Sequence, residues 1–342
     1  MDKLVIEPGH GIRVVAGEVG PVGPTEVRIA PSHSYISAGT ELTGVRNAQR
    51  AAPGATGHQT GYSQAGTVLE VGPAVTRVGV GDRVAAIGQG AFHATETVVA
   101  QNLVVPIPET VDSASASVAA MFCFAIEAVH KSSVRLGQKV VVFGAGMMGQ
   151  MATRLYQLSG AEVAVVDGLD YRRDRLPDGV YVVGPDEQGW QGLAGWAKPY
   201  GVEHACIAFG GDATESVQRL KPLMSVGPDG VPAGRIVFPG GAEIHLMMAS
   251  AMGNIELLSS AKAGPGYRDA QYESGIDYPT AYVPYPVRRN VETMLGFLES
   301  GALSVDELIT HRYPFADAET AYRDLDERPS EILAAVLTYE QP

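Results

Sequence analysis

Residues 139–150 read KVVVFGAGMMGQ, and this stretch decides the fold of half the chain. Its first apolar run predicts a buried strand, and Gly144, Gly146 and Gly149 follow in the spacing G-x-G-x-x-G. Apolar side chains then recur at helical spacing as far as Tyr156. The first glycine allows a tight turn, the second lets a pyrophosphate approach the backbone, and the third lets the helix pack on the strand. The stretch therefore predicts a nucleotide-binding turn.

The next predicted strand, EVAVVD, indicates which nucleotide binds there. It ends on Asp167, at the spacing expected for an acid that binds ribose hydroxyls. A carboxylate in this place repels a 2′-phosphate, which favours NAD over NADP, although Arg172 lies close behind it. A glycine-rich turn that only packs would leave Asp167 unexplained. We also assign Met147, Met148, Arg172 and Gly210 to the cofactor site.

Outward from this turn, two patterns divide the chain. From about residue 112 onward strands and helices alternate, which predicts a parallel sheet covered by helices. Residues 113–133, SASASVAAMFCFAIEAVHKSS, are expected to form one helix with a serine near its start as N-cap. The first third instead contains short runs rich in Val, Ile and Thr between Gly and Pro breakers, which predicts a β-barrel or sandwich.

Composition limits the kinds of partner. A chain of 342 residues suits two domains. Its net charge of −13 argues against nucleic acid and against an anionic membrane surface. The N-terminus shows no secretory signal, and the apolar run at 118–126 is too short to span a bilayer. With two cysteines, neither a disulfide framework nor a four-cysteine metal lobe is possible. We expect a cytoplasmic protein.

Several segments in this order resemble the medium-chain dehydrogenase/reductase superfamily, of the zinc alcohol dehydrogenase type. They are GTVLEVGPAVTRVGVGDRVAA, HATE at 93–96, LGQKVVVFGAGMMG, GRIVFPGG and SGALSVDELITHRYPF. The resemblance implies an α/β protein with a GroES-like β-barrel catalytic domain, residues 1–123 and 264–342, divided by a Rossmann NAD-binding domain, residues 124–263. It also implies an active site between the domains and a homodimer or homotetramer.

The resemblance also identifies positions where a metal would bind. Zinc-dependent relatives carry a C-G-x-D motif, a G-H-E motif and a third ligand before the cofactor domain. This chain has A-G-T-E at 38–41 and G-Y-S at 61–63, and Cys123 alone falls at the third position. A catalytic zinc takes three protein ligands, which one thiolate does not supply. His58 lies in a predicted loop, and His93 belongs to a stretch that relatives with and without zinc share. We predict no metal.

Without zinc, the protein must supply a proton acceptor and hydrogen-bond donors for the substrate oxygen. Residues at the vacated positions are the natural candidates. Tyr62 can exchange a proton with the substrate if its neighbours lower its pKa. Ser37, Thr40 and Ser63 can donate or accept hydrogen bonds, and Glu41 can act as a base or bind a hydroxyl.

Each catalytic candidate has a structural alternative. Tyr62 can fill the volume left by the metal and its ligands. Glu41 can cap a loop or pair with Arg46, and Cys123 can be a small core residue. His93, a further catalytic candidate, can instead orient a loop.

A long stretch at 264–279, GPGYRDAQYESGIDYP, follows the last predicted Rossmann strand. Its Tyr267, Arg268 and Tyr272 combine ring faces with hydrogen-bonding groups, as a site for a polyhydroxylated ligand requires. Long loops in compact domains are usually functional or disordered, and this one is too aromatic to be disordered. We assign these three residues to substrate binding. The alternative is a subunit contact.

The leading hypothesis is a zinc-independent, NAD-dependent dehydrogenase. It would oxidise a secondary alcohol of a small polar substrate, such as a sugar, a cyclitol or a secondary-metabolite intermediate. One alternative is an NAD(P)H-dependent reductase of C=C bonds, of the enone or quinone type. The other is a catalytically silent nucleotide-binding protein.

Overall fold

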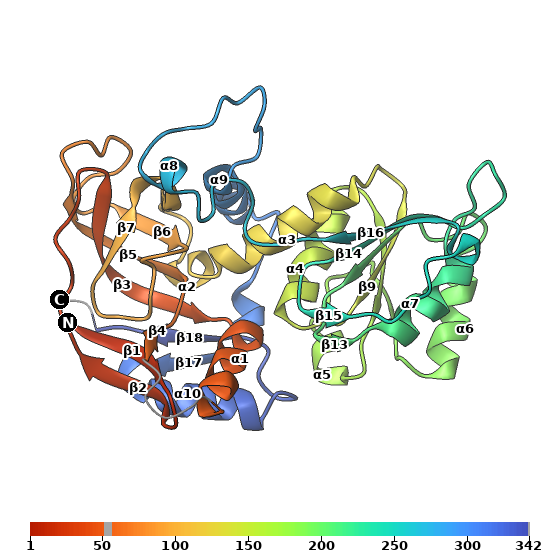
Figure 1. Ribbon diagram of the computed structural model, residues 1–342, viewed down its shortest axis with the longest axis horizontal. Coiled ribbons are helices and arrows are strands. Elements are labelled where there is room, and N and C mark those ends of the chain that lie inside the picture. The colour runs from red at the N-terminus through yellow and green to blue at the C-terminus, as the bar shows by residue number, and fades with distance from the viewer. Residues whose placement is uncertain (51–56, 341–342) are drawn as a thin grey trace. The chain divides into compact units, whose positions relative to one another are not determined.

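The computed structural model describes residues 1–50 and 57–340 (Figure 1). The chain divides into two compact units. Unit 1 contains Met1–Cys123 and Ala263–Pro342, and unit 2 contains Phe124–Lys262. Among the described residues, no helix is both long and apolar enough to cross a membrane.

Unit 2 is built on a parallel sheet of six strands in the order β11-β10-β9-β12-β14-β16. The strands are β9 Lys139–Phe143, β10 Glu162–Val166, β11 Tyr181–Val183, β12 His204–Ile207, β14 Ala233–Phe238 and β16 Asn254–Ser259. A short parallel pair, β13 Gly211–Asp212 and β15 Ala242–Glu243, lies outside this sheet. The order of the six strands is that of a doubly wound dinucleotide-binding domain, so the predicted Rossmann fold is confirmed.

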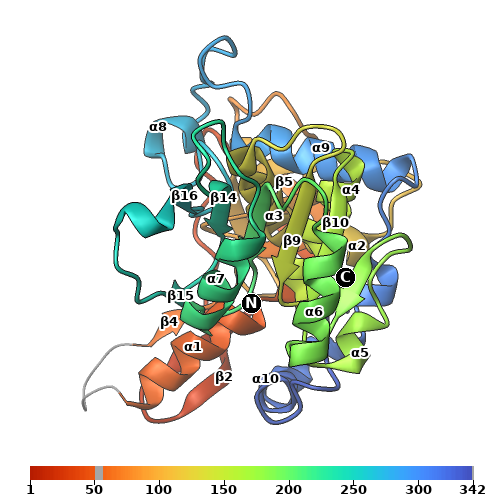
Figure 2. The same cartoon turned by 90° about the vertical axis from the view of Figure 1, so that its right-hand side faces the viewer.

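Helices cover both faces of this sheet, as Figure 2 shows. They are α4 Met147–Leu158, α5 Asp170–Arg173, α6 Glu187–Trp196 and α7 Thr214–Leu220, with the 3₁₀ turns η2 Lys221–Leu223 and η3 Ser250–Met252. On one face α6 and α7 bury Leu193 and Val217 against β9 and β12. Because both faces are covered, β9 is a continuous apolar run, with Val141 and Val142 fully buried.

Unit 1 is mainly β-structure. Its larger sheet has the order β17-β18-β3-β5-β6-β8, with β7 also paired to β3, and a smaller sheet has the order β2-β1-β4. The strands are β1 Asp2–Glu7, β2 Gly11–Ala16, β3 Glu26–Ile36, β4 His58–Gln59, β5 Ser63–Val71, β6 Arg83–Ile87, β7 Thr97–Ala100, β8 Val104–Pro106, β17 His311–Pro314 and β18 Ala335–Thr338. The predicted GroES-like architecture is therefore confirmed, and the C-terminal strands complete the sheet begun by β3.

The helices of unit 1 are short and border the sheets. They are α1 Ala38–Gln49, α2 Ser113–Ala116, α8 Ala270–Glu273, α9 Val287–Glu299 and α10 Ala318–Glu327, with the 3₁₀ turns η1 Gln101–Leu103, η4 Asp306–Leu308 and η5 Phe315–Asp317. In Figure 1, α1 and α10 lie beside the smaller sheet. A core cluster that includes Leu4, Ile6, Leu42 and Tyr322 joins these elements.

The predicted helix at 113–133 forms as two helices, α2 and α3 Ala119–Ser132. The N-cap of α2 is Asp112 rather than a serine, and its carboxylate accepts a hydrogen bond from Ser115 N. The break lies where the Ser63 hydroxyl donates to Ser117 O and accepts from Ala120 N. A side chain from β5 thus takes over backbone groups that a continuous helix would pair internally.

Candidate active site

The glycine-rich turn between β9 and α4 has the geometry that a diphosphate requires. Gly144 has a φ of 93°, which favours glycine. A Cβ on Gly149 would come within 1.8 Å of Gly144 O, so the helix packs closely on the turn. Around Gly146 the nearest atom to an added Cβ is Arg172 Nη1, 3.9 Å away. The N-terminus of α4 therefore faces open space beside a guanidinium, and these residues fit a dinucleotide.

Asp167 braces this turn. It is 8% exposed, its Oδ2 accepts from Ala145 N at 2.6 Å, and its Oδ1 accepts from Leu169 N at 2.8 Å. Each carboxylate oxygen can accept a further bond, which leaves capacity for ribose hydroxyls. The sequence did not reveal that the carboxylate also supports the backbone of the turn.

The other assigned cofactor residues lie close to the turn or at the end of a neighbouring strand. Met147 and Met148 begin α4, and Met147 is buried. Gly210 follows β12, at the carboxyl end of the sheet. The nearest atom to a Cβ added there would be Gly241 O, 3.8 Å away. This position is where doubly wound folds bind ligands.

In unit 1, three hydroxyl groups meet at the start of α1. Ser37 is the N-cap residue, and the side chains of Ser37 and Thr40 hydrogen-bond to the Tyr62 phenol. Burial, together with the charge of Glu41, raises the pKa of Tyr62, and the two hydroxyl bonds oppose this only in part. The condition under which Tyr62 was expected to exchange a proton, a lowered pKa, is therefore not met. Tyr62 therefore keeps its proton at neutral pH.

Glu41 is fully engaged inside unit 1. Its Oε1 accepts from Ser37 N at 2.8 Å, and its Oε2 accepts from the Thr60 hydroxyl at 2.7 Å and from the Tyr322 hydroxyl. His93 Nε2 lies 3.1 Å from the same Oε2. The carboxylate is 3% exposed. It lies in helix α1 rather than in a loop, and Arg46, its suggested partner, pairs with Asp326 instead.

The surroundings of Glu41 keep its carboxyl ionised. Burial alone would raise its pKa, but the nearby His93 and the hydrogen bonds from His93, Tyr322 and Thr60 outweigh burial and lower the pKa. Its Oε2 is filled by protein donors and the carboxylate is 3% exposed, which disfavours Glu41 as a base for a substrate. Its role is to organise the fold around the hydroxyl cluster.

His93 continues this buried network away from Glu41. Its Nδ1 lies 2.6 Å from the Ser34 hydroxyl, which in turn lies 2.7 Å from the Tyr339 hydroxyl. Because both ring nitrogens have partners and the ring is fully buried, His93 acts through Glu41 rather than on a ligand. Thr60, Tyr322, Ser34 and Tyr339 were not found from the sequence. No local spacing links Glu41 to Tyr322, which is 281 residues away.

Ser63 is not available for catalysis either. Its side chain is fully buried, and its hydroxyl is occupied by the backbone of residues 117 and 120. The expectation that Ser63 hydrogen-bonds a substrate is therefore wrong. It holds the start of α3 against β5.

The three residues of the long loop that were assigned to substrate binding have different surroundings. An added Cβ on Gly88 would lie 3.2 Å from Tyr267 Cε2, so the ring of Tyr267 lies against that glycine. Arg268 is exposed, with its N donating to Glu273 Oε1 at 2.8 Å. Tyr272 is 1% exposed and stacks on Tyr278 with 5.0 Å between ring centroids. Tyr272 is therefore a core residue of the loop, contrary to its predicted role as a ligand.

The residues at the zinc positions do not fit a metal. Ala38 offers no donor atom, Tyr62 is a protonated phenol, and Ser63 bonds to the backbone. Cys123 is fully buried, and His58 is exposed on β4. Across residues 1–50 and 57–340, no group of three or more His, Cys, Asp or Glu is placed to hold a metal ion.

Comparisons with known proteins agree with this geometry. No family model matches the chain. It is 28% identical over 306 residues to a D-xylulose reductase of Scheffersomyces stipitis, covering 77% of each chain. It is also 28% identical over 301 residues to sorbitol dehydrogenase 1 of Saccharomyces cerevisiae, covering 77% of this chain and 76% of that one.

Solved structures share the fold at lower identity. An alcohol dehydrogenase from Thermus sp. ATN1 superposes with a TM-score of 0.79 at 18% identity, covering 99% of this chain and 100% of that one. Galactitol-1-phosphate dehydrogenase from Escherichia coli gives 0.76 at 17% identity, with the same coverage. A putative zinc-binding dehydrogenase from Sinorhizobium meliloti bound to NADP gives 0.75 at 17%, covering 98% of each.

The fold and these relatives define an oxidoreductase built from a GroES-like and a Rossmann domain. The relatives and structural neighbours that the chain resembles are medium-chain, zinc-type alcohol and polyol dehydrogenases. Dehydrogenases of this family use nicotinamide cofactors.

Proposed function

We propose that the protein is a zinc-independent, NAD-dependent dehydrogenase that oxidises a secondary alcohol of a small polar substrate. The observation that carries this proposal is the hydroxyl cluster of Tyr62, Ser37 and Thr40, in which Tyr62 takes the position expected for a histidine ligand in zinc-dependent relatives. The names of the curated relatives, D-xylulose reductase and sorbitol dehydrogenase, support a polyol or sugar alcohol as substrate.

The proposed roles follow from protonation. A bound nicotinamide would supply the acceptor for the hydride that leaves the substrate carbon. Tyr62, because it keeps its proton, would donate a hydrogen bond to the substrate oxygen and stabilise negative charge on it. Ser37 and Thr40 would orient that phenol. The hydroxyl proton of the alcohol would leave to solvent, since Glu41 is buried and engaged with protein donors. Because release of a proton is favoured at high pH, oxidation should accelerate as pH rises.

The preference for NAD is a proposal based on Asp167. Its carboxylate would accept bonds from two ribose hydroxyls and repel a 2′-phosphate. Arg172 next to Gly146 would favour a phosphate, and one structural neighbour is bound to NADP. A direct titration with both cofactors decides between them. Asp167→Ser should reduce the difference in affinity between NAD and NADP. Asp170→Ser, which removes an exposed acid of α5, should leave that difference unchanged.

One plate assay tests the activity. Purified protein is mixed with NAD or NADP and a panel of polyols, cyclitols and sugar alcohols, and with NADH or NADPH and a panel of enones, while absorbance of the reduced cofactor is followed. We expect turnover of a polyol with NAD, unchanged by EDTA, in protein that carries no stoichiometric zinc. Turnover of enones alone would favour the C=C reductase. Cofactor binding without any turnover would favour a silent nucleotide-binding protein.

A further inference from the structure

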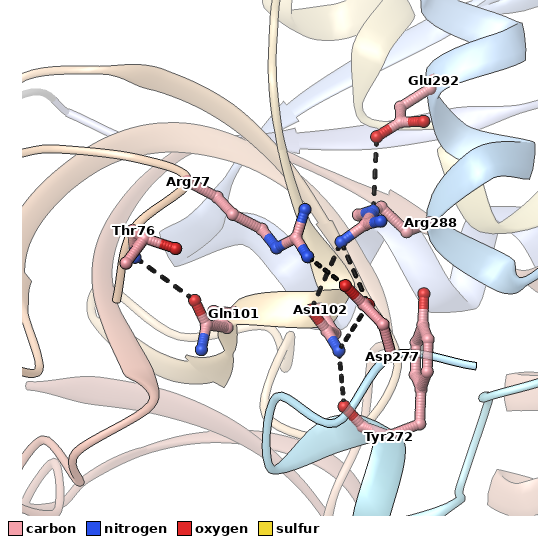
Figure 3. Close-up of polar contacts among 8 residues, drawn as sticks. All are labelled: Thr76, Arg77, Gln101, Asn102, Tyr272, Asp277, Arg288 and Glu292. Carbon is pink, nitrogen blue, oxygen red and sulfur yellow. Dashed lines mark hydrogen bonds and ion pairs between the residues drawn. The ribbon is translucent and has the colours of Figure 1, made fainter. Parts of the chain in front are cut away.

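Asp277 connects the long loop of unit 1 to three other elements, as Figure 3 shows. Its Oδ2 lies 2.5 Å from Arg77 Nη2, in the turn between β5 and β6. Its Oδ1 lies 3.4 Å from Arg288 Nη1 of α9 and 3.4 Å from Asn102 Nδ2 of η1. One carboxylate thus joins the loop to the barrel and to the returning helix.

The side chain of Asp277 is itself 44% exposed, but two of the groups that it meets are held by other contacts. Asn102 is fully buried and also donates from Nδ2 to Tyr272 O at 2.7 Å. The side chain of Arg288 is 18% exposed, and its Nε lies 3.3 Å from Glu292 Oε1. Because Arg288 and Asn102 are already held in place, Asp277 meets a preformed set of donors. Such a pair loses less side-chain entropy than two free surface chains do.

From Asp277 the structure runs through aromatic packing towards Tyr267. The neighbouring Tyr278 stacks on Tyr272 and donates its hydroxyl to Asp269 Oδ2 at 2.5 Å. The Tyr272 ring also lies against Gly266, where an added Cβ would be 2.5 Å from a ring carbon. Asp269 N closes the turn onto Gly266 O at 3.3 Å. The loop is therefore a small packed unit that carries Tyr267.

Tyr267 connects this packed unit to the segment that carries Tyr62. Its ring lies against Gly88, whose N donates to the backbone carbonyl of Tyr62 at 2.9 Å. Electrostatic coupling between the Tyr267 and Tyr62 phenols is consistent with this proximity. Burial, opposed by Arg268, raises the pKa of Tyr267 to about 12, so this phenol also keeps its proton.

We propose that Asp277 is a positioning residue that holds Tyr267 beside the hydroxyl cluster by fixing the loop to Arg77, Arg288 and Asn102. This proposal rests on the proposed function, because it takes Tyr267 to contact the substrate. Asp277 itself touches no reacting atom. It determines the affinity for a polar substrate through the loop and leaves the chemical step alone.

The test combines amide hydrogen exchange with steady-state kinetics on the full chain. In Asp277→Ala, we expect exchange across residues 263–286 and the KM of the polyol each to rise about fivefold, with kcat within about twofold, as for loss of a well-placed ion pair. Arg77→Ala should raise exchange and KM in the same way. In Arg77→Lys, which keeps the positive charge, both should stay close to their values in the unmodified protein. Asp306→Ala breaks a different ion pair of unit 1, with Arg312, and should change neither measurement.

The outcomes separate this proposal from the proposed function. Unchanged exchange in Asp277→Ala would overturn the anchoring role. Faster exchange with unchanged KM would show that the loop is anchored but does not position Tyr267 for the substrate, and would also overturn the proposal. Failure of the proposed function would appear in the unmodified protein, as no turnover of any polyol, and the exchange measurement would still decide whether Asp277 fixes the loop.

Discussion

At Tyr62 a phenol replaces a metal ligand, and its value to catalysis depends on the proton that it retains. Burial and the Glu41 carboxylate raise its pKa, so the donor persists across the usual assay range. We expect Tyr62→Phe to lower kcat about tenfold, as when a hydrogen bond made to the transition state is removed. The affinity for NAD should not change.

A matched variant controls for the loss of any tyrosine hydroxyl. Tyr313→Phe removes a phenol that donates to Asp324 Oδ2 at 3.0 Å, outside the cluster. It should leave kcat unchanged. If Tyr62→Phe behaves like this control, the phenol only fills space, and the proposed transition-state bond is refuted.

Glu41 should matter for stability rather than for the chemical step. It is a buried carboxylate with donors from Ser37, Thr60 and Tyr322, and Glu41→Gln would place an amide donor among them. We expect the free energy of unfolding to fall by about 2–3 kcal/mol at pH 7. Glu319→Gln, an exposed acid of α10, is the control and should have little effect.

The pH dependence of that deficit follows from the lowered pKa of Glu41. A carboxyl whose folded pKa lies below its unfolded value stabilises the fold above the unfolded value of 4.5 and loses that contribution as pH falls through the folded pKa. The deficit of Glu41→Gln in urea titrations should therefore shrink below about pH 4.5. A deficit that is constant from pH 7 to pH 3 would contradict this account.

Which residues occupy the site was partly predictable. Ser37, Thr40 and Tyr62 were identified because they stand at motif positions, and the structure places their hydroxyls together. Whether a polar group is free depends on partners distant in the chain. The sequence could not show that the Ser63 hydroxyl bonds to the backbone at the start of α3. Nor could it show that the Tyr322 hydroxyl bonds to Glu41.

Among the elements, the turn between β9 and α4 offers the sharpest test because two of its glycines serve different purposes. Gly146→Val adds its Cβ to open space, so the fold should persist with an unchanged Tm while binding of NAD and NADP is lost. Gly149→Ala places a Cβ 1.8 Å from Gly144 O and should destabilise unit 2 by about 2 kcal/mol or more. Calorimetric titration and thermal unfolding read the two effects separately. A Gly146→Val protein that binds NAD normally would refute the assignment of this turn.

Element boundaries were predictable where the local pattern was strong. The apolar run of β9 and the periodic face of α4 depend on neighbours in sequence, and both formed as expected. The helix at 113–133 divided because Ser63, 54 residues before Ser117, competes for its backbone groups. Long-range competition of this kind leaves no trace in helical periodicity.

For the whole molecule, the fold class followed from the order of segments, because alternating strands and helices allow few sheet arrangements. The long loop was located but not resolved into roles. From composition alone, each tyrosine of the loop is an equal candidate for binding a polar ligand. Only the packing shows that Tyr272 is buried in the loop, whereas Tyr267 lies against Gly88.

We propose that the protein assembles as a homodimer or homotetramer. In unit 2, β16 forms one edge of the six-stranded sheet, and within the described residues only its inner side is paired. The preceding segment exposes Met247 and Met248, which are 83% and 70% exposed. Exposed apolar side chains and an open strand edge each favour association with another chain. A second copy is the occupant we expect.

Light scattering after size exclusion should give twice or four times the chain mass of 36.0 kDa. Replacing both Met247 and Met248 with lysine should lower that mass without weakening NAD binding, because charge on an apolar contact is costly to bury. Leu136→Lys, a change at another side chain of unit 2 that is 84% exposed, controls for added charge and should leave the mass unchanged. A monomeric mass for the unmodified protein at micromolar concentration would refute the assembly. An unchanged mass in the double variant would place the contact elsewhere on the chain.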